Sequence, residues 1–244
     1  MCIRDRGDAN ASAQYLFDAS NMDLQVVSAK DDKAYPGVSM HRTMFLLKDD
    51  SFRKPLVIDI FKLTSEHENQ YDLPVWFLGH LLSASFDYEK EEKSLTTLGS
   101  DHGYQHIWRE ATGHSVKEST QITWFNNRKF FTLTSATEPS DELIFVKTGA
   151  NDPDFNLRYD PALIHRKKGG KDALFVSAIE SHGRYNPVSE VSSDPFSGLD
   201  KIEVLHDSVD YTIVKITGKS KKTWTIGLSN IDNEPTHSLS LIHI

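Results

Sequence analysis

Hydrophobic and polar residues alternate along short stretches of this chain, which is the pattern of β-strands buried on one face. The clearest case is Leu56–Leu63 (LVIDIFKL), where the even positions 56, 58 and 60 are Leu or Ile. The preceding stretch, Val38–Leu47, alternates in part and ends at the polar segment Lys48–Ser51. Two strands joined by a short polar turn predict an antiparallel hairpin.

Other strand-like segments flank residues that favour tight turns. Asn126–Arg128 contains two asparagines, which tolerate positive φ, and Gly169–Gly170 is a strong hairpin signal. The expected hairpins are Gln121–Phe125 with Lys129–Thr134, Leu163–Arg166 with Ala173–Glu180, and Tyr211–Thr217 with Thr223–Leu228. Single strands are expected at Leu24–Ala29, Leu73–Leu78, Leu82–Tyr88, Glu142–Lys147 and Ile202–His206. About a dozen short strands with almost no helical periodicity predict an all-β fold, a large antiparallel β-sandwich.

Composition narrows the function classes without naming one. The chain has 244 residues, and its formal net charge of −8 argues against nucleic-acid binding, which needs a basic face. No apolar run approaches the roughly 18 residues of a membrane span. The same negative field means that a polyanionic ligand would need a local basic or hydrogen-bonding site.

The two ends have the sequences MCIRDR (residues 1–6) and LSLIHI (residues 239–244). Both are what a transposon-derived sequencing adapter encodes, once in each orientation, so we expect them to be adapter scars. Residues 7–238 are then expected to form an incomplete β-sandwich domain of a longer protein. Cys2, the one cysteine, falls in the first scar, so no disulfide or thiolate metal site is expected in residues 7–238.

Three motifs carry a family resemblance. They are YDLPVWFLGHLL with GYQHIWREATG, WFNNRKFFTLTSAT with DELIFVKTGANDPDFNLRYDPALIHR, and LFVSAIESHGRYNPVSEV. In this order they resemble the C-terminal part of heparinase II/III-like polysaccharide lyases, most closely the oligo-alginate lyases of polysaccharide lyase family 17. The resemblance extends over most of Ala34–Ile216.

The resemblance implies a parent enzyme in which an N-terminal helical toroid precedes β-sheet layers. The resemblance implies cleavage of uronate polymers by β-elimination, with catalytic Tyr, His and Asn groups from the toroid and a structural divalent metal (zinc) bound by the first β-strands. The His-Gly-His-x-Asp and His-Asn motifs associated with these roles do not occur in this chain and are expected upstream of Gly7. No catalytic residue and no metal ligand is therefore assigned here. The parent is expected to be periplasmic or secreted, and this chain itself gives no localisation signal.

A compact group of polar and aromatic residues is the candidate for substrate contact. It comprises Tyr104, Gln105, His106, Trp108 and Arg109. His102 and His106 could suggest a metal pair, but residues four apart on a strand are separated by about 13 Å. Structural packing remains the alternative interpretation for the whole group.

Other candidates have simpler structural explanations. The four tryptophans could stack on sugar rings, although each lies in an apolar segment where core burial is the default. The basic residues Arg166, Lys167, Lys168 and Lys171 could attract a uronate chain, although a solvated hairpin tip is the better explanation. Asn151–Asn156 lacks the graded spacing of a Ca²⁺ loop, and no motif frames a nucleophile.

Two function classes remain open. The first is the C-terminal β-sandwich fragment of a lyase acting on alginate or a related uronate polymer. It would be inactive alone and would act together with the missing toroid of the same chain. The second is a non-catalytic carbohydrate-binding or structural sandwich. A parent acting on sulfated glycosaminoglycans is a further variant of the first class.

Overall fold

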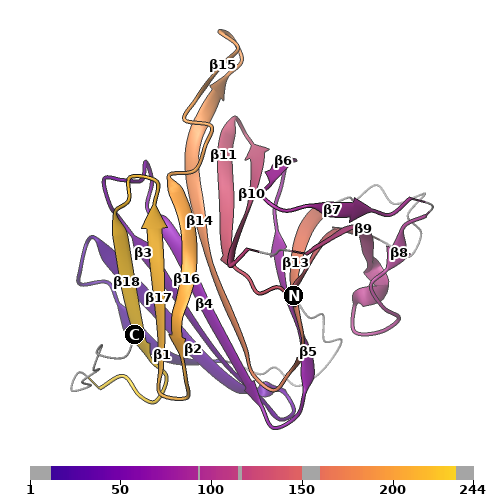
Figure 1. The fold of residues 1–244 in the computed structure, drawn as a ribbon. Helices are drawn as coiled ribbons and strands as arrows, with labels where there is room; N and C mark the ends of the chain where they lie inside the picture. The colour runs from indigo at the N-terminus through magenta and orange to yellow at the C-terminus, as the bar shows by residue number, and fades with distance from the viewer. Residues whose placement is uncertain (1–11, 93, 115–116, 150–159, 235–244) are drawn as a thin grey trace.

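β-Strands make up most of the computed structural model, which describes residues 12–92, 94–114, 117–149 and 160–234 (Figure 1). Within these ranges the helical structure is limited to one 3₁₀ turn, η1 (Tyr104–His106). The strand pairs are antiparallel. The predicted all-β antiparallel fold is therefore confirmed.

The strands form three sheets, which we call A, B and C. Sheet A runs in the order β1 (Ala13–Asp18), β2 (Leu24–Tyr35), β3 (Val38–Leu47), β4 (Leu56–Ser65), β14 (Ala173–Asn186), β11 (Lys129–Ala136), β10 (Ser119–Asn126) and β6 (His80–Ala84), and β15 (Val191–Ser193) pairs with β14. Sheet B runs β5 (Asn69–Trp76), β13 (Asp160–Gly170), β12 (Glu142–Thr148), β9 (Ile107–His114) and β7 (Tyr88–Lys90), with β8 (Thr96–Thr97) also on β9. Sheet C consists of β16 (Leu199–Asp207), β17 (Tyr211–Gly218) and β18 (Thr223–Ser229).

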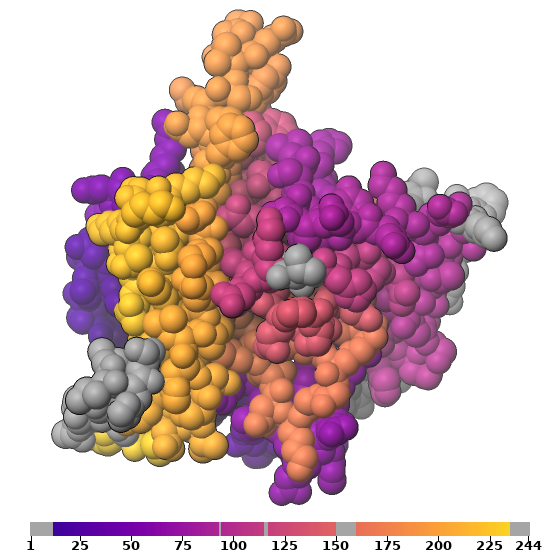
Figure 2. Space-filling view, in the orientation of Figure 1, coloured from indigo at the N-terminus to yellow at the C-terminus, as the bar shows by residue number. Residues whose placement is uncertain are grey.

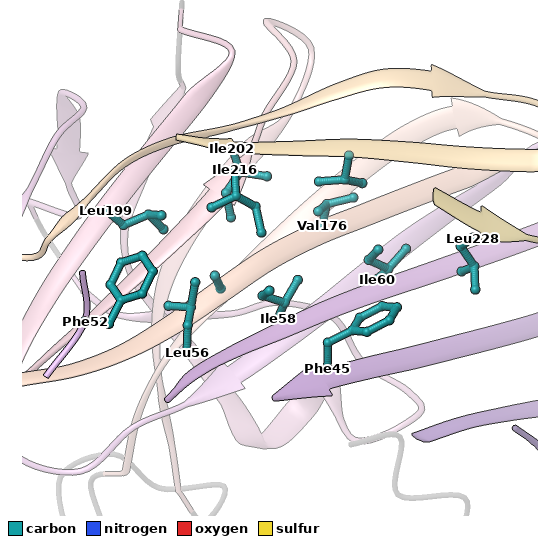
Figure 3. Close-up of a cluster of buried hydrophobic side chains, with 12 residues drawn as sticks. Phe45, Phe52, Leu56, Ile58, Ile60, Val176, Leu199, Ile202, Ile216 and Leu228 are labelled. Carbon is teal, nitrogen blue, oxygen red and sulfur yellow. The ribbon is translucent and has the colours of Figure 1, made fainter. Parts of the chain in front are cut away.

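Sheet A is the middle layer, because alternate residues of its strands enter different cores. Ile58 and Val176 pack with residues of sheet C in the cluster of Figure 3. Phe175, the neighbour of Val176 in the chain, packs instead with Leu73 of sheet B. A strand places successive side chains on opposite faces, so sheets B and C cover opposite faces of sheet A.

The core between sheets A and C is closely packed. Leu56, Ile58 and Ile60 of β4 are fully buried there, as is Ile216 of β17. Each such side chain stabilises the fold by roughly 1.5–3 kcal/mol relative to exposure. Glu180 of β14 fixes the start of β16, because its carboxylate accepts hydrogen bonds from the Gly198 and Leu199 amides.

Turn chemistry predicted two tight hairpins correctly. Asn127 and Arg128 have φ values of 48° and 65° in the turn joining β10 and β11. β17 and β18 also pair as a hairpin. The predicted pairing of Val38–Leu47 with Leu56–Leu63 is confirmed as β3 and β4, in continuous register.

The hairpin predicted around Gly169–Gly170 is wrong. β13 continues to Gly170 and pairs with β12 and β5, whereas β14 begins at Ala173 and pairs with β11 and β4. The chain therefore crosses from sheet B to sheet A at this point. Gly169, at φ 72°, supplies the sharp backbone change, but the strands that leave it belong to different layers.

The end of β14 and β15 form an arm that stands clear of the body (Figures 1 and 2). Its base is held by His182, whose Nδ1–H donates to the Asp194 carbonyl at 2.9 Å while Thr132 Oγ1 donates to Nε2 at 2.9 Å. Val188 near its tip is 92% exposed.

Candidate functional site

The candidate contact residues lie on η1 and at the start of β9, so they do not share one continuous strand. His102 and Gly103 have φ values of 57° and 89°, which turn the chain into η1. Backbone hydrogen bonds hold both sides of the turn, from Leu98 N to the Ile107 carbonyl and from Gly149 N to the His106 carbonyl. Leu98 and Ile107 pack on the outer side of sheet B with Ile144 and Ile164. The turn is thus a cap over that face of the sheet.

Tyr104 is tied to an ion pair on sheet B. Its hydroxyl donates to Asp72 Oδ2 at 2.6 Å, and Arg166 binds both oxygens of the same carboxylate, at 2.8 and 2.7 Å. The side chains of Arg166 and Asp72 are only 7% and 6% exposed. Burial lowers the pKa of Arg166, but the hydrogen bond and charge of Asp72 outweigh it and raise that pKa. Tyr104 therefore links η1 to β5 and β13.

The side chains of Gln105 and His106 differ in their hydrogen bonding. The Gln105 side-chain oxygen accepts a hydrogen bond from the Gly103 amide at 2.9 Å, so it stabilises its own turn. The His106 imidazole is half-buried and makes no hydrogen bond within the residues that the structure describes. Of the two side chains, His106 has the greater capacity to contact an external ligand.

Trp108 and Arg109 continue along β9. Trp108 is half-buried and pairs in register with Lys147 of β12. The Arg109 guanidinium lies 4.0 Å from Glu91, and its Nε is buried without a hydrogen-bond partner among the described residues. Tyr104 thus reaches toward β5 while Arg109 reaches toward the segment after β7, at the opposite edge of sheet B. A ligand that touched both would have to lie across the sheet.

The predicted basic tip is a set of ion pairs. Arg166 is buried against Asp72, and Lys167 is 12% exposed and contacts Glu138 and Asp141. Lys168 is half exposed and binds Glu142 at 2.7 Å. The interpretation of Arg166 and Lys167 as solvated tip residues is wrong, because β13 extends to Gly170 and carries both into the sheet.

A buried Asp–His pair escaped the sequence analysis. His165 Nε2 lies 2.6 Å from Asp141 Oδ2, with side chains 5% and 1% exposed. Burial raises the pKa of Asp141, but His165 and Lys167 together outweigh it, so the pKa is lowered. No sequence signal connected these residues, because Asp141 directly precedes β12 while His165 lies in β13, and the two meet only through the register of these strands.

A cavity of about 670 Å³ lies beside this pair, between β16 and the β13–β14 connection. Its lining includes the carboxylates of Glu118, Glu138, Asp141, Asp172, Glu203 and Asp207, but only the two lysines Lys167 and Lys168. This excess of negative charge repels a polyanion. The cavity is therefore a poor site for a uronate polymer.

Two of the tryptophans proposed from the sequence as sugar-stacking candidates differ in their exposure. Trp124 is buried in the core between sheets A and B, as the packing interpretation predicted, whereas Trp76 is 38% exposed. Asn151–Asn156 lies outside the described residues.

The described ranges hold no group of three His, Cys, Asp or Glu side chains placed to bind a metal. They also contain no helix that is long and apolar enough to cross a membrane.

Comparisons with known proteins place these features in context. An alginate lyase from Stenotrophomonas maltophilia (strain K279a) is 34% identical over 233 residues, covering 96% of this chain and 31% of that protein. An exo-oligoalginate lyase from Saccharophagus degradans is 31% identical over 226 residues, covering 91% of this chain and 30% of that protein. The chain thus spans just under a third of the length of these curated relatives.

Solved structures show the same fold at low sequence identity. The heparan sulfate lyase HepC from Pedobacter heparinus superposes with a TM-score of 0.54 at 11% identity, over 91% of this chain and 28% of that one. A mutant of that enzyme gives a TM-score of 0.53, also at 11% identity, over 90% of this chain and 28% of that one. No family model matches the chain.

Proposed function

This chain belongs to the heparinase-like and alginate-lyase-like polysaccharide lyases, and from that premise we propose that it is the β-sheet part of a longer lyase. Its substrate would be alginate or a related uronate polymer, cleaved by β-elimination. The observation that carries the proposal is the 34% identity to the Stenotrophomonas alginate lyase over nearly the whole chain.

β-Elimination makes three chemical demands. The uronate carboxylate must be neutralised, a base must remove the C5 proton, and an acid must protonate the departing O4. The phenol of Tyr104 is engaged with Asp72, and the imidazole of His165 is buried against Asp141. Because both side chains already have partners within the chain, we infer that the proton-transferring groups belong to the part of the protein that this chain does not span. The chain alone would then be inactive.

The contact role falls to η1 and β9. The Arg109 guanidinium, on a side chain that is 33% exposed, and the His106 ring could meet a uronate carboxylate, since a guanidinium is a strong donor to carboxylates. Trp108 precedes Arg109 in β9, so its side chain lies on the opposite face of the sheet and would not join this contact. The partner of this surface would be a helical toroid of the same polypeptide, holding the catalytic groups and any structural metal site. The whole enzyme would be periplasmic or secreted.

Activity of the chain alone is the direct test. The purified chain is incubated with alginate oligomers, and unsaturated uronate ends are measured against a full-length Stenotrophomonas lyase as the positive control. We expect product only from the control, because the chain lacks a complete set of proton-transferring groups. Product from the chain, abolished by Tyr104→Phe, would overturn the proposal that the proton-transferring groups lie outside this chain.

Binding by the chain alone addresses the rival function. A lyase fragment with half of its cleft should bind alginate oligosaccharides weakly or not at all. Saturable binding that Arg109→Ala removes and Lys168→Ala preserves would instead favour a non-catalytic carbohydrate-binding module. Lys168 is a suitable control because it is a half-exposed cation on the same sheet, already paired with Glu142.

A further inference from the structure

Sheet B covers only part of one face of sheet A. It packs on β10, β11, β14 and the end of β4, through the clusters that contain Leu133 and Phe175. Val38 and Met40, at the start of β3, still pack against the second of these clusters. On β1, β2 and the rest of β3 the same face is open. Phe17, Val27, Met44 and Leu46, which we call the open face, are 65%, 44%, 38% and 38% exposed.

The open face is continuous across neighbouring strands. Phe17 pairs with Val27 and Val27 with Met44, so three apolar side chains stand in one row. Leu46 lies two residues from Met44 on the same face, beside Val57 of β4. Apolar residues grouped in this way mark an interaction surface more often than single exposed ones do.

The charged groups at the border of the open face already have partners. Arg42 donates to both oxygens of Asp59, at 2.9 and 2.6 Å, and its guanidinium lies 5.2 Å from the centre of the Phe61 ring. Their charges are therefore largely satisfied within the chain. The surface left for a partner is mainly apolar.

Sheet B is unsuited to extend over this surface by adding a strand. In the described part of the chain, β5 is an edge strand with β13 as its one neighbour. Pro74 lies in the middle of β5, and proline is tolerated in an edge strand where its missing N–H would face outward. A new strand on that edge would lack a central hydrogen bond. The occupant should therefore be a packed domain surface.

We propose that the open face is the seat of the remainder of the longer protein. The inference rests on the proposed function and on the relatives, of which more than two thirds lies beyond the matched segment. Contacts between domains of one chain commonly join partly apolar surfaces of this kind. The remainder would present apolar side chains to Phe17, Val27, Met44 and Leu46.

Methionine oxidation tests the seat without relying on activity. This chain alone is compared with a chimera in which it replaces the matched segment of the Stenotrophomonas lyase. Met44 reports on the open face, and Met22, 74% exposed before β2, is the internal reference. We expect peroxide to oxidise both in the chain alone, and Met44 several-fold more slowly in the chimera. Equal oxidation of Met44 in both proteins would overturn the proposal.

Charged variants give a second readout. The double variant Met44→Glu/Leu46→Glu should lower the melting temperature of the chimera but not that of the chain alone. Val188→Glu, on the exposed arm, should lower neither. Alginate cleavage by the chimera is scored separately: a folded, inactive chimera with protected Met44 refutes the proposed function and leaves the seat standing. An active chimera in which Met44 is not protected supports the proposed function and refutes the proposal that the open face is the seat.

Two further outcomes are decisive. A defined dimer of the chain alone, with Met44 protected, would show that a second copy occupies the open face and would overturn the proposal. If the chimera does not fold, hydroxyl-radical footprinting of the natural Stenotrophomonas lyase reads the strand aligned with β3. Protection at the positions aligned with Met44 and Leu46 supports the seat, and exposure there refutes it.

Discussion

At the scale of single residues, Gly79 shows how closely two layers approach. It follows β5 of sheet B and precedes β6 of sheet A, at the point where the chain changes sheet. Its φ is 98°, and a Cβ atom there would lie 2.0 Å from the Phe125 carbonyl oxygen. Both the backbone conformation and the space require glycine.

Gly79→Ala should therefore lower the free energy of unfolding by at least about 2 kcal/mol, through backbone strain and steric overlap. Gly227→Ala in β18 is the matched control, because its added Cβ would meet no atom within 4 Å. Urea unfolding of both variants is the measurement. Similar midpoints for the two would contradict the steric argument.

At the scale of elements, the Asp72–Arg166 pair joins β5, β13 and η1 in one network. Arg166 also lies 3.7 Å from Glu142 of β12. A buried guanidinium keeps its charge, so it depends on these carboxylates in the folded state. The segment that holds the candidate contact residues is thus positioned by a strand pair distant in sequence.

Asp72→Ala should destabilise the chain by roughly 3–5 kcal/mol, because it leaves the buried Arg166 charge without its main partner. Tyr104→Phe removes one hydrogen bond and should cost only about 1 kcal/mol. Thermal unfolding compares the two. A Tyr104→Phe loss as large as that of Asp72→Ala would mean that the phenol, and not the ion pair, anchors η1.

Sequence alone predicted part of this arrangement, for a physical reason. Alternation and turn residues specify which face of a strand is buried and where a tight hairpin forms, as at Asn127 and Arg128. They do not specify the partner strand, so the crossing after Gly169–Gly170 looked like a hairpin. Tyr104 was a candidate by residue type, but its partner Asp72 becomes visible only when η1 folds over sheet B.

At the scale of the whole molecule, a polar cluster between sheets A and C makes the stability of the folded chain depend on pH. His41 of β3 is 8% exposed, contacts Ser28 Oγ at 2.8 Å and packs edge-on against Tyr15 at 4.9 Å. Burial, followed by the charges of Lys30 and Lys62, lowers the pKa of His41 to about 4. His41 is therefore neutral in the folded protein at neutral pH.

The unfolded chain takes up a proton at His41 near the usual pKa of about 6.5, before the folded chain does. Stability from neutral His41 is thus fully present above that pH and is lost as the pH falls toward 4. The loss should be about 3 kcal/mol, because a difference of one unit in pKa between the folded and unfolded chain corresponds to about 1.4 kcal/mol. His41→Gln should flatten the pH dependence of urea unfolding between these limits. His67→Gln, at an exposed position, should leave the slope unchanged.

The pairing of β4 with β14 has a consequence for synthesis on the ribosome. β4 ends at Ser65 and its partner begins at Ala173, so the edge of β4 stays unpaired until most of the chain has been made. Long-range antiparallel pairing of this kind slows folding and leaves strand edges open to wrong partners. During translation, the first four strands would wait as a half-finished sheet, and slower elongation after Ser65 would prolong their exposure to chaperones and aggregation alike.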